Sequence, residues 1–180
     1  MAAARRLFVE RGYHDTRPQD ISKEAGVGHG TFYLHFEDKL DCFLAFTDEA
    51  AKELEAVLNK HLENAGTFED VIREILIGTH EYGEEHPGVL AAALTDVTVL
   101  SKGDTGRKTA SVRWAEGWAS LIERWKATGE VAADVDSRLA GVVLVGATKQ
   151  AGAYATRNRL DVDYYIDHMT RLFVGALRAQ

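Results

Sequence analysis

The stretch from Thr16 to Lys39 constrains the fold of this 180-residue chain more than any other. Thr16, with Gln19 three residues later, matches the Thr-x-x-Gln capping pattern that opens a helix. Gly26 suits the left-handed residue that closes a helix. A second short helix is predicted directly after it, over residues 29–35. Two short helices joined by a glycine-containing turn form a helix-turn-helix unit.

The rest of the chain also predicts helices, because apolar residues recur at steps of three and four from end to end. Only two prolines interrupt 180 residues. We therefore expect an all-α fold. Its nine helices are predicted over about residues 2–11, 16–25, 29–35, 39–64, 67–86, 87–100, 107–128, 136–154 and 161–180.

Composition narrows the class of protein further. The single Cys42 excludes an internal disulfide and suits a reducing compartment. No apolar run approaches the ~18 residues of a membrane span. The start of the chain lacks the apolar region of a secretory signal. We therefore expect a cytoplasmic protein with no membrane association.

Short motifs follow one another in unbroken register over about the first 45 residues, with Lys39 after them: Ala-Arg-Arg-Leu-Phe (4–8), Arg-Gly-Tyr (11–13), Asp-Ile (20–21), Ala-Gly-Val (25–27) and Gly-Thr-Phe-Tyr-Leu-His-Phe (30–36). In these motifs the chain resembles the TetR family of transcriptional regulators. This resemblance implies a helix-turn-helix DNA-binding domain over residues 1–45. An effector-binding and dimerisation domain would follow over residues 46–180, joined to the first domain through a long shared helix.

The resemblance also implies which residues contact a double-stranded DNA operator. The helix at 29–35 would enter the major groove and present the side chains that do not face its own core. The start of the preceding helix, which we expect to be exposed, would clamp phosphate. The candidate DNA-binding residues are Thr16, Arg17, Gln19, His29, Gly30, Thr31, Tyr33, Leu34, His35 and Lys39.

Two features of this domain depart from the family pattern. Gln19 occupies a position that is often Arg, and Gln pairs with adenine where Arg favours guanine. Capping of the helix by Gln19 would compete with that reading. The second departure is charge, because the chain carries a net charge of −7 and residues 1–46 hold six basic and seven acidic residues. A DNA-binding domain is expected to be basic.

The later helices are expected to serve dimerisation and effector binding. By resemblance, the last two helices form a four-helix bundle with those of a second copy, and glycines 141, 146 and 152 suit either that interface or packing within the chain. Polar and aromatic groups within the apolar helices are candidates for effector contact, although a tryptophan stripe is more often core: Tyr82, His86, Asp96, Thr98, Trp114, Trp118 and Tyr154. We expect no metal site and no cofactor.

Three functions fit the sequence. The first is a homodimeric regulator, a repressor released from a palindromic operator when a small-molecule effector tilts the long helix and changes the spacing of the recognition helices. The second is a helical small-molecule-binding protein whose DNA-binding domain is degenerate, which the acidic balance of residues 1–46 favours. The third is a DNA-binding protein without an effector. No nucleophile–base pair or phosphate loop supports an enzyme.

Overall fold

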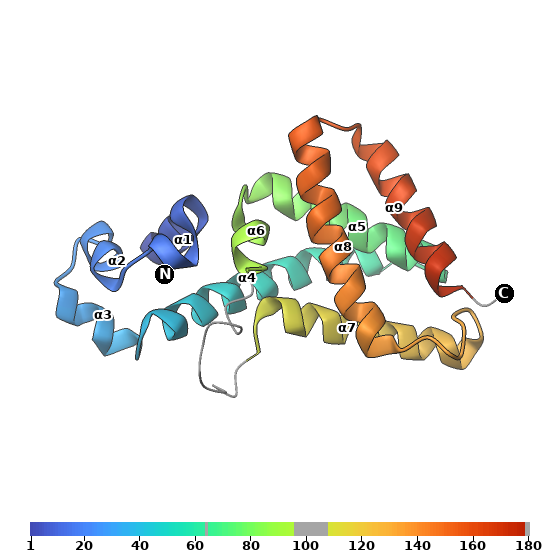
Figure 1. Cartoon of the computed structure of the whole chain (residues 1–180), viewed down its shortest axis with the longest axis horizontal. Coiled ribbons are helices and arrows are strands. Elements are labelled where there is room, and N and C mark those ends of the chain that lie inside the picture. Colours follow the sequence, from blue (N-terminus) through green and yellow to red (C-terminus); the bar gives the residue numbers. More distant parts are fainter. Residues whose placement is uncertain (64, 96–107, 179–180) are drawn as a thin grey trace. The chain divides into compact units, whose positions relative to one another are not determined.

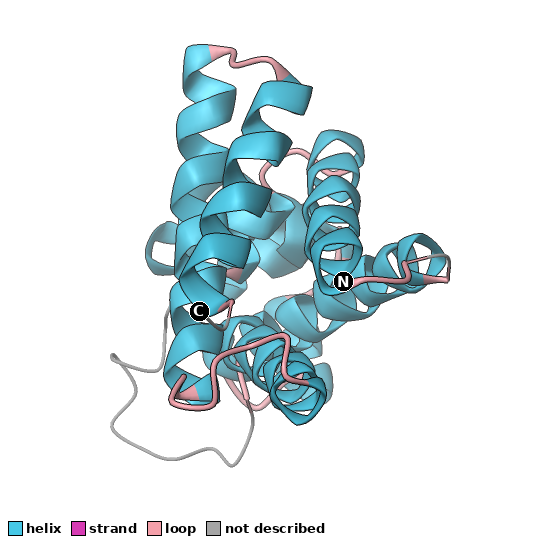
Figure 2. Cartoon of the chain, turned by 90° about the vertical axis from the view of Figure 1, so that its right-hand side faces the viewer, coloured by secondary structure: helices cyan, strands magenta, loops and turns pink. Residues whose placement is uncertain are grey.

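The computed structural model describes residues 1–63, 65–95 and 108–178, and all regular secondary structure in this part of the chain is helical (Figures 1 and 2). The predicted all-α fold with nine helices is confirmed within these residues. The helices are α1 (Ala2–Asp15), α2 (Pro18–Glu24), α3 (His29–His35), α4 (Lys39–Leu62), α5 (Phe68–Glu85), α6 (Val89–Ala93), α7 (Ala110–Thr128), α8 (Ser137–Asn158) and α9 (Val162–Leu177).

The chain divides into two compact units. The N-terminal unit comprises Met1–Lys52 and His86–Ala110, and the C-terminal unit comprises Glu53–Glu85 and Ser111–Gln180. Helix α4 contributes to both. The predicted domain boundary at residues 45 and 46 falls inside α4 and stays a prediction.

An aromatic cluster forms the core of the N-terminal unit. The ring of Phe8 meets that of Phe43 edge to face at 5.1 Å and lies 5.8 Å from that of Phe46, and all three side chains are fully buried. Gly12 interrupts the helical backbone of α1 with φ of +77°, which is accessible to glycine at little cost. Beyond this break, the ring of Tyr13 stacks on that of Phe8.

The C-terminal unit is built around α5, α7, α8 and α9. Helices α5 and α9 pack on each other, and α8 runs beside α9 (Figures 1 and 2). Trp118 and Trp125 are both buried in this core, where they meet Phe173 and Phe68 edge to face. The largest buried apolar side chains around them are Ile72, Ile75, Leu76, Ile122, Leu144, Tyr165, Ile166, Met169, Val174 and Leu177.

Side-chain caps open the helices of this unit where the sequence predicts them. Asp136 accepts hydrogen bonds from the first amides of α8, and Asp161 accepts one from the amide of Tyr164 in α9. Thr67 and Asp70 cap each other at the start of α5. Each cap satisfies amides that have no partner within the helix.

The apolar stripe predicted along α8 lies on its outer side. Leu139, Val142, Val143 and Tyr154 are 57–63% exposed, whereas Gly141 and Leu144 face the interior. The periodicity therefore located an apolar face without showing what it packs against. No helix in the described ranges combines the length and the apolar character needed to cross a membrane.

Candidate nucleic-acid interface

Helix α3 presents one buried and one exposed face. Phe32 is 4% exposed and lies 5.4 Å from the ring of Phe36, so this side of the helix is anchored in the N-terminal unit. Beyond this anchored side, Leu34 is 82% exposed, and Tyr33 is 52% exposed although its ring meets that of Phe32 edge to face at 5.2 Å. Gly30 lies on the surface with open space where a Cβ would be. The outer face of α3 can therefore approach another surface closely.

The histidines of α3 lie at its two ends and are both exposed. The ring of His29 meets that of Tyr33 edge to face at 5.2 Å, which restricts the orientation of the tyrosine. His35 ends the helix, and Thr31 is half-buried. The structure thus brings His29 and Tyr33 together and leaves Leu34 exposed, and their contact with DNA stays a prediction.

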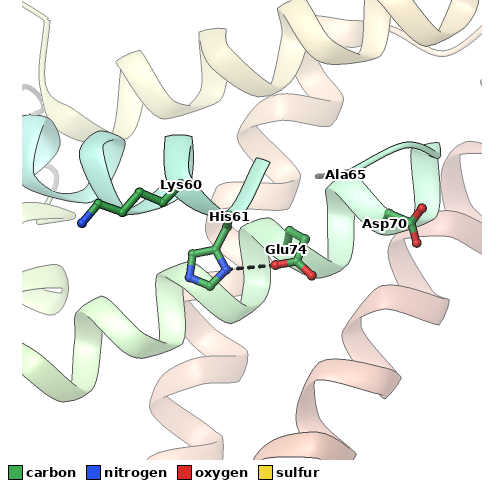
Figure 3. Close-up of a pocket in the computed structure, with 5 residues that line it drawn as sticks. All are labelled: Lys60, His61, Ala65, Asp70 and Glu74. Carbon is green, nitrogen blue, oxygen red and sulfur yellow. Dashed lines mark hydrogen bonds and ion pairs between the residues drawn. The ribbon is translucent and has the colours of Figure 1, made fainter. Parts of the chain in front are cut away.

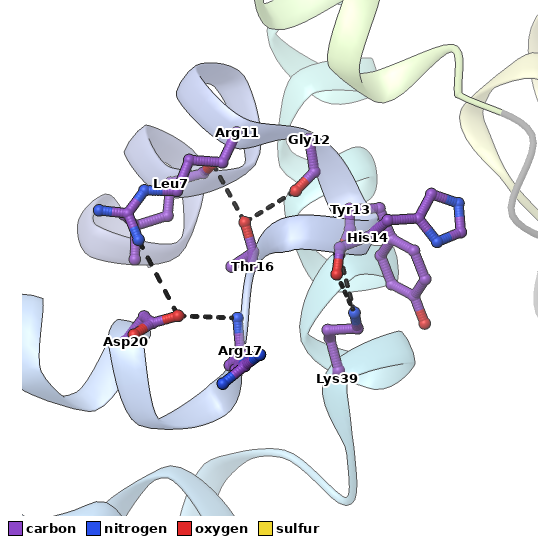
Figure 4. A network of polar contacts seen from close by, with 9 residues as sticks. All are labelled: Leu7, Arg11, Gly12, Tyr13, His14, Thr16, Arg17, Asp20 and Lys39. Carbon is purple, nitrogen blue, oxygen red and sulfur yellow. Dashed lines mark hydrogen bonds and ion pairs between the residues drawn. The ribbon is translucent and has the colours of Figure 1, made fainter.

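The predicted role of Thr16 at the start of α2 is wrong. Its side chain is fully buried instead of exposed, and its hydroxyl donates to the carbonyl of Gly12 at 2.7 Å and lies 3.2 Å from that of Leu7 (Figure 4). The hydroxyl ties the start of α2 to α1. It is therefore not available to cap α2 or to contact phosphate.

The capping box is displaced by one residue from its predicted position. The backbone amide of Arg17 donates to Oδ2 of Asp20 at 3.3 Å, so Asp20 takes the role predicted for Gln19. Arg17 and Gln19 are exposed at the start of α2. The capping function no longer competes with base reading by Gln19.

Lys39 is held in place by the end of α1. Its ammonium donates to the carbonyls of Tyr13 at 2.8 Å and His14 at 3.2 Å, and it lies 4.3 Å from the centre of the Tyr13 ring (Figure 4). Burial lowers the pKa of Lys39, the charge of Asp15 opposes this, and that of Arg17 adds to it. Lys39 thus has a structural role that the sequence did not reveal, and its contact with phosphate stays a prediction.

Two further cations of this unit are paired with carboxylates. The guanidinium of Arg6 forms an ion pair with Glu24 of α2. That of Arg11 lies 3.9 Å from Oδ2 of Asp20 (Figure 4). Both pairs join α1 to α2, so an external anion would compete with a carboxylate for each of these arginines.

Comparison with known proteins identifies this unit. Residues 1–46 match the sequence model of the family described as "Bacterial regulatory proteins, tetR family". Residues 1–46 form a TetR-family domain. The match covers all of α1, α2 and α3 and the first part of α4, which are the elements that position the exposed face described above.

A protein relative and two solved structures place the TetR-family domain in a wider context. The chain is 38% identical over 58 residues to the HTH-type transcriptional repressor BepR of Brucella suis, an alignment that covers 32% of this chain and 28% of BepR. A tetR family transcription regulator from Shewanella sp. PV-4 is similar in fold, with a TM-score of 0.82 at 20% identity over 99% of this chain and 96% of that one. FadR of Bacillus subtilis, solved in complex with stearoyl-CoA, has a TM-score of 0.75 at 18% identity, over 96% and 95% of the two chains.

The sequence alignments and the structural similarities cover different fractions of the chain. The sequence alignments cover only 24% to 40% of the length of BepR and four other relatives. The solved structures cover nearly the whole chain, but at identities that establish the fold alone. The TetR-type fold therefore extends through α9, whereas sequence similarity to BepR is confined to 58 residues.

The residues predicted to bind an effector do not gather around one cavity in the described structure. Tyr82 is fully buried and donates to Glu53 at 2.7 Å, and Trp118 belongs to the core. Tyr154 is 57% exposed, contrary to the prediction that it faces an interior pocket. His86 and Trp114 are half-buried, and Asp96 and Thr98 lie outside the described residues.

A pocket is present elsewhere in the C-terminal unit. It has a volume of about 440 Å³ and lies between the end of α4 and the start of α5 (Figure 3). Its lining is polar and shares no residue with the predicted set: Lys60, His61, Ala65, Asp70 and Glu74.

Proposed function

We propose that this chain is a homodimeric transcriptional regulator that reads a palindromic DNA duplex with α3 of each subunit. The exposed face of α3 carries the proposal, because Tyr33 and Leu34 are 52% and 82% exposed on a helix anchored by a buried Phe32. Contacts with the rings of His29 and Phe32 account for part of the position of Tyr33, but folding does not explain so exposed a leucine at position 34. The major groove of DNA admits a helix and offers thymine methyl groups for apolar contact. BepR, which is 38% identical to this chain over 58 residues, is named as a repressor, so repression is the mode we propose.

A second copy of the chain would supply the second recognition helix. Two-fold pairing sets half-sites about one turn of DNA apart, roughly 34–36 Å. The outer face of α8 and α9 suits this pairing, since Leu139, Val142 and Val143 of α8 and Leu172 of α9 are 57–63% exposed. Burying these side chains would contribute roughly 25 cal/mol per Å² of apolar area. We therefore place the dimer interface on α8 and α9.

The dimer interface is tested by charge substitution. Val142→Glu and Val143→Glu together should shift the mass measured by light scattering from dimer to monomer. Ala127→Glu is the matched control, because Ala127 is exposed on α7. A double variant that remains dimeric would place the interface elsewhere.

The salt dependence of DNA binding follows from the ion pairs of the N-terminal unit. Of the six basic residues in 1–46, Arg6 and Arg11 are paired with carboxylates, Lys39 is bound to carbonyls and Arg5 is half-buried, whereas Arg17 and Lys23 lie exposed at the surface. Two such cations per subunit give four in a dimer. With about 0.9 counterions released per phosphate contact, log K should fall with log [salt] with a slope of about −4.

We further propose that the C-terminal unit binds a small-molecule effector and binds it without transforming it. FadR of B. subtilis shares this fold and was solved with stearoyl-CoA, so an acyl-CoA is the first effector to test. Release from DNA requires the effector to favour one of two conformations of the protein. A coupling free energy of about 1–3 kcal/mol between effector binding and DNA binding gives a 5- to 150-fold loss of affinity for DNA. Such a regulator would act in the cytoplasm.

The deciding experiment is selection of bound duplexes from a random pool by the purified chain, followed by sequencing. A palindromic consensus with half-sites one helical turn apart is the expected result. Titration of that duplex with and without stearoyl-CoA then tests the effector. Operator affinity that stays constant while stearoyl-CoA demonstrably binds would exclude it as the effector.

The alternative is a small-molecule-binding protein whose DNA-binding unit is degenerate. The observation that favours it is charge, since residues 1–46 hold seven acidic against six basic residues. Selection at low salt separates the two functions, because phosphate contacts are strongest there. Absence of any enriched duplex at 50 mM salt would favour the alternative.

A further inference from the structure

His61 lies between two carboxylates of the C-terminal unit. It belongs to the last turn of α4, and its Nδ1 is 2.9 Å from Oε2 of Glu74 on α5 (Figure 3). Its Nε2 is 2.8 Å from Oε2 of Glu81, about two turns further along α5. The side chain of His61 is 19% exposed, so the ring is largely sheltered from water. One imidazole thus joins two helices through both of its nitrogens.

This arrangement depends on the charge of the imidazole. A neutral ring has one N–H donor and one lone pair, whereas an ionised carboxylate only accepts hydrogen bonds. Both contacts of His61 are hydrogen bonds only when both nitrogens carry protons. Loss of one proton places a lone pair against a carboxylate oxygen, which turns one attractive contact into a repulsive one. The geometry therefore matches an imidazolium.

Gly78 makes room for the ring on α5. A Cβ at this position would lie 2.9 Å from Cδ2 of His61 and 3.0 Å from Cδ2 of Leu58. Residues 74, 78 and 81 follow the i, i+4, i+7 spacing that shares one helix face. One face of α5 thus carries two acceptors with a gap between them, and His61 occupies the gap.

The other charges near His61 are accounted for. On α4 the neighbouring charge is Lys60, which lines the same polar pocket as His61. On α5 Asp70 also lines this pocket, in the first turn of the helix, and is hydrogen bonded to Thr67. Arg73 of α5 is paired with Asp167 of α9.

The balance of these interactions favours the charged ring. The hydrogen bond that His61 donates to Glu74 is the main cause that raises the pKa of His61 above its usual value of 6.5. Burial opposes this increase, and Glu81 adds to it.

We propose that His61 is a pH-sensitive latch that holds the end of α4 on α5 while its ring is protonated and loosens this contact when the proton leaves. The latch is fully closed below the pH at which a histidine in the unfolded chain titrates. It opens as the pH rises through the higher value at which His61 titrates in the folded chain. Glu81, which is 54% exposed, is free to turn toward water when the latch opens.

Histidine NMR of the full chain between pH 5 and pH 9 tests the latch directly. The His61 signal, assigned with a His61→Gln variant, should titrate above 6.5. Glu74→Gln should lower the midpoint of this titration more than Glu81→Gln does. The reason is that the hydrogen bond accepted by Glu74 raises the pKa of His61 more than the contact with Glu81 does. Gly78→Ala should also lower the midpoint by displacing the ring. A midpoint at or below 6.5 in the wild-type chain, or one indifferent to Glu74→Gln, would overturn the proposal.

Unfolding in urea over the same pH range gives a second readout. The wild-type chain should lose stability above neutral pH relative to His61→Gln, whose amide keeps hydrogen-bonding capacity but does not titrate. His80→Gln, on the same helix α5, is the control and should retain the wild-type pH dependence. If the pH profiles of the His61→Gln and wild-type chains run parallel, the latch does not operate. Should His61→Gln fail to fold, Glu74→Gln provides the same comparison.

Discussion

Replacement of Gly141 by Ala tests the packing of α8 on α7 most directly. A Cβ at this position would lie 2.2 Å from the carbonyl oxygen of Ala115 and 3.3 Å from the amide nitrogen of Ala119. The ordinary separation of such carbon and oxygen atoms is about 3.3–3.6 Å. Because both neighbours are backbone atoms, neither can rotate away. The two helices must therefore separate by about 1 Å at the site of contact, which follows from the difference between these distances.

The expected loss of stability follows from two opposing contributions. Overpacking a close contact costs about 1–3 kcal/mol, and rigid backbone on the other side favours the upper end of this range. Alanine in place of glycine inside a helix recovers about 1 kcal/mol. The free energy of unfolding should thus fall by about 2 kcal/mol. For a chain of this size that lowers Tm by about 4–8 °C.

Gly117→Ala is the matched control. Gly117 lies within α7, the helix that Gly141 contacts, but a Cβ there would have open space around it. This variant should gain about 1 kcal/mol from helix propensity alone. Thermal unfolding followed by circular dichroism, at one fixed protein concentration, compares the two. If both variants are stabilised equally, the close approach of α7 and α8 at Gly141 is refuted.

Three further outcomes are expected in the N-terminal unit. Thr16→Val should lower the free energy of unfolding by about 1–3 kcal/mol because the buried carbonyls of Leu7 and Gly12 lose their donor, whereas Thr16→Ser should retain most of the stability in the same urea assay. Lys39→Met should cost about 1–2 kcal/mol by removing two charge-assisted hydrogen bonds, and unchanged urea unfolding would exclude that structural role. The buried Cys42, whose pKa is raised to about 12 by burial, should resist a thiol reagent at pH 8 until the chain is unfolded; rapid modification of the folded chain would contradict its burial.

The fold was largely predictable because its signals are local. The carboxylates of Asp136 and Asp161 accept hydrogen bonds from amides in the first turns of α8 and α9. The few residues around each cap therefore determine where the helix begins. The end of α7 is also a local signal, because Gly129 directly follows its last residue and adopts the left-handed φ of +80° that closes a helix. The direction of the apolar face of α8 was not predictable in this way. The core side of that helix is defined by Gly141 and Leu144, which pack against elements distant in sequence.

The candidate interface shows where local patterns mislead. Two possible capping boxes at the start of α2 are offset by one residue, one from Thr16 to Gln19 and one from Arg17 to Asp20. Nothing within these residues decides between them. The choice follows from the carbonyls of α1, because the hydroxyl of Thr16 is buried against them and Asp20 then takes the amide of Arg17. A tertiary contact thus selects the cap and leaves Gln19 on the surface.

For the proposed function, the number of charged residues in the sequence and the number of cations without an ion pair in the structure lead to different expectations for DNA binding. Residues 1–46 hold six basic and seven acidic residues and so have no excess of cations, but this count treats every arginine alike. Arg6 and Arg11 each hold α1 to α2 through a carboxylate of α2, so their charge is largely used within the unit. Exposed pairs of this kind contribute little to stability and can exchange partners. DNA phosphates would compete for the same guanidinium groups, and a salt slope steeper than about −4 would mean that these pairs open on binding. The net charge of a helix-turn-helix unit is therefore a poor guide to its affinity until its internal ion pairs are known.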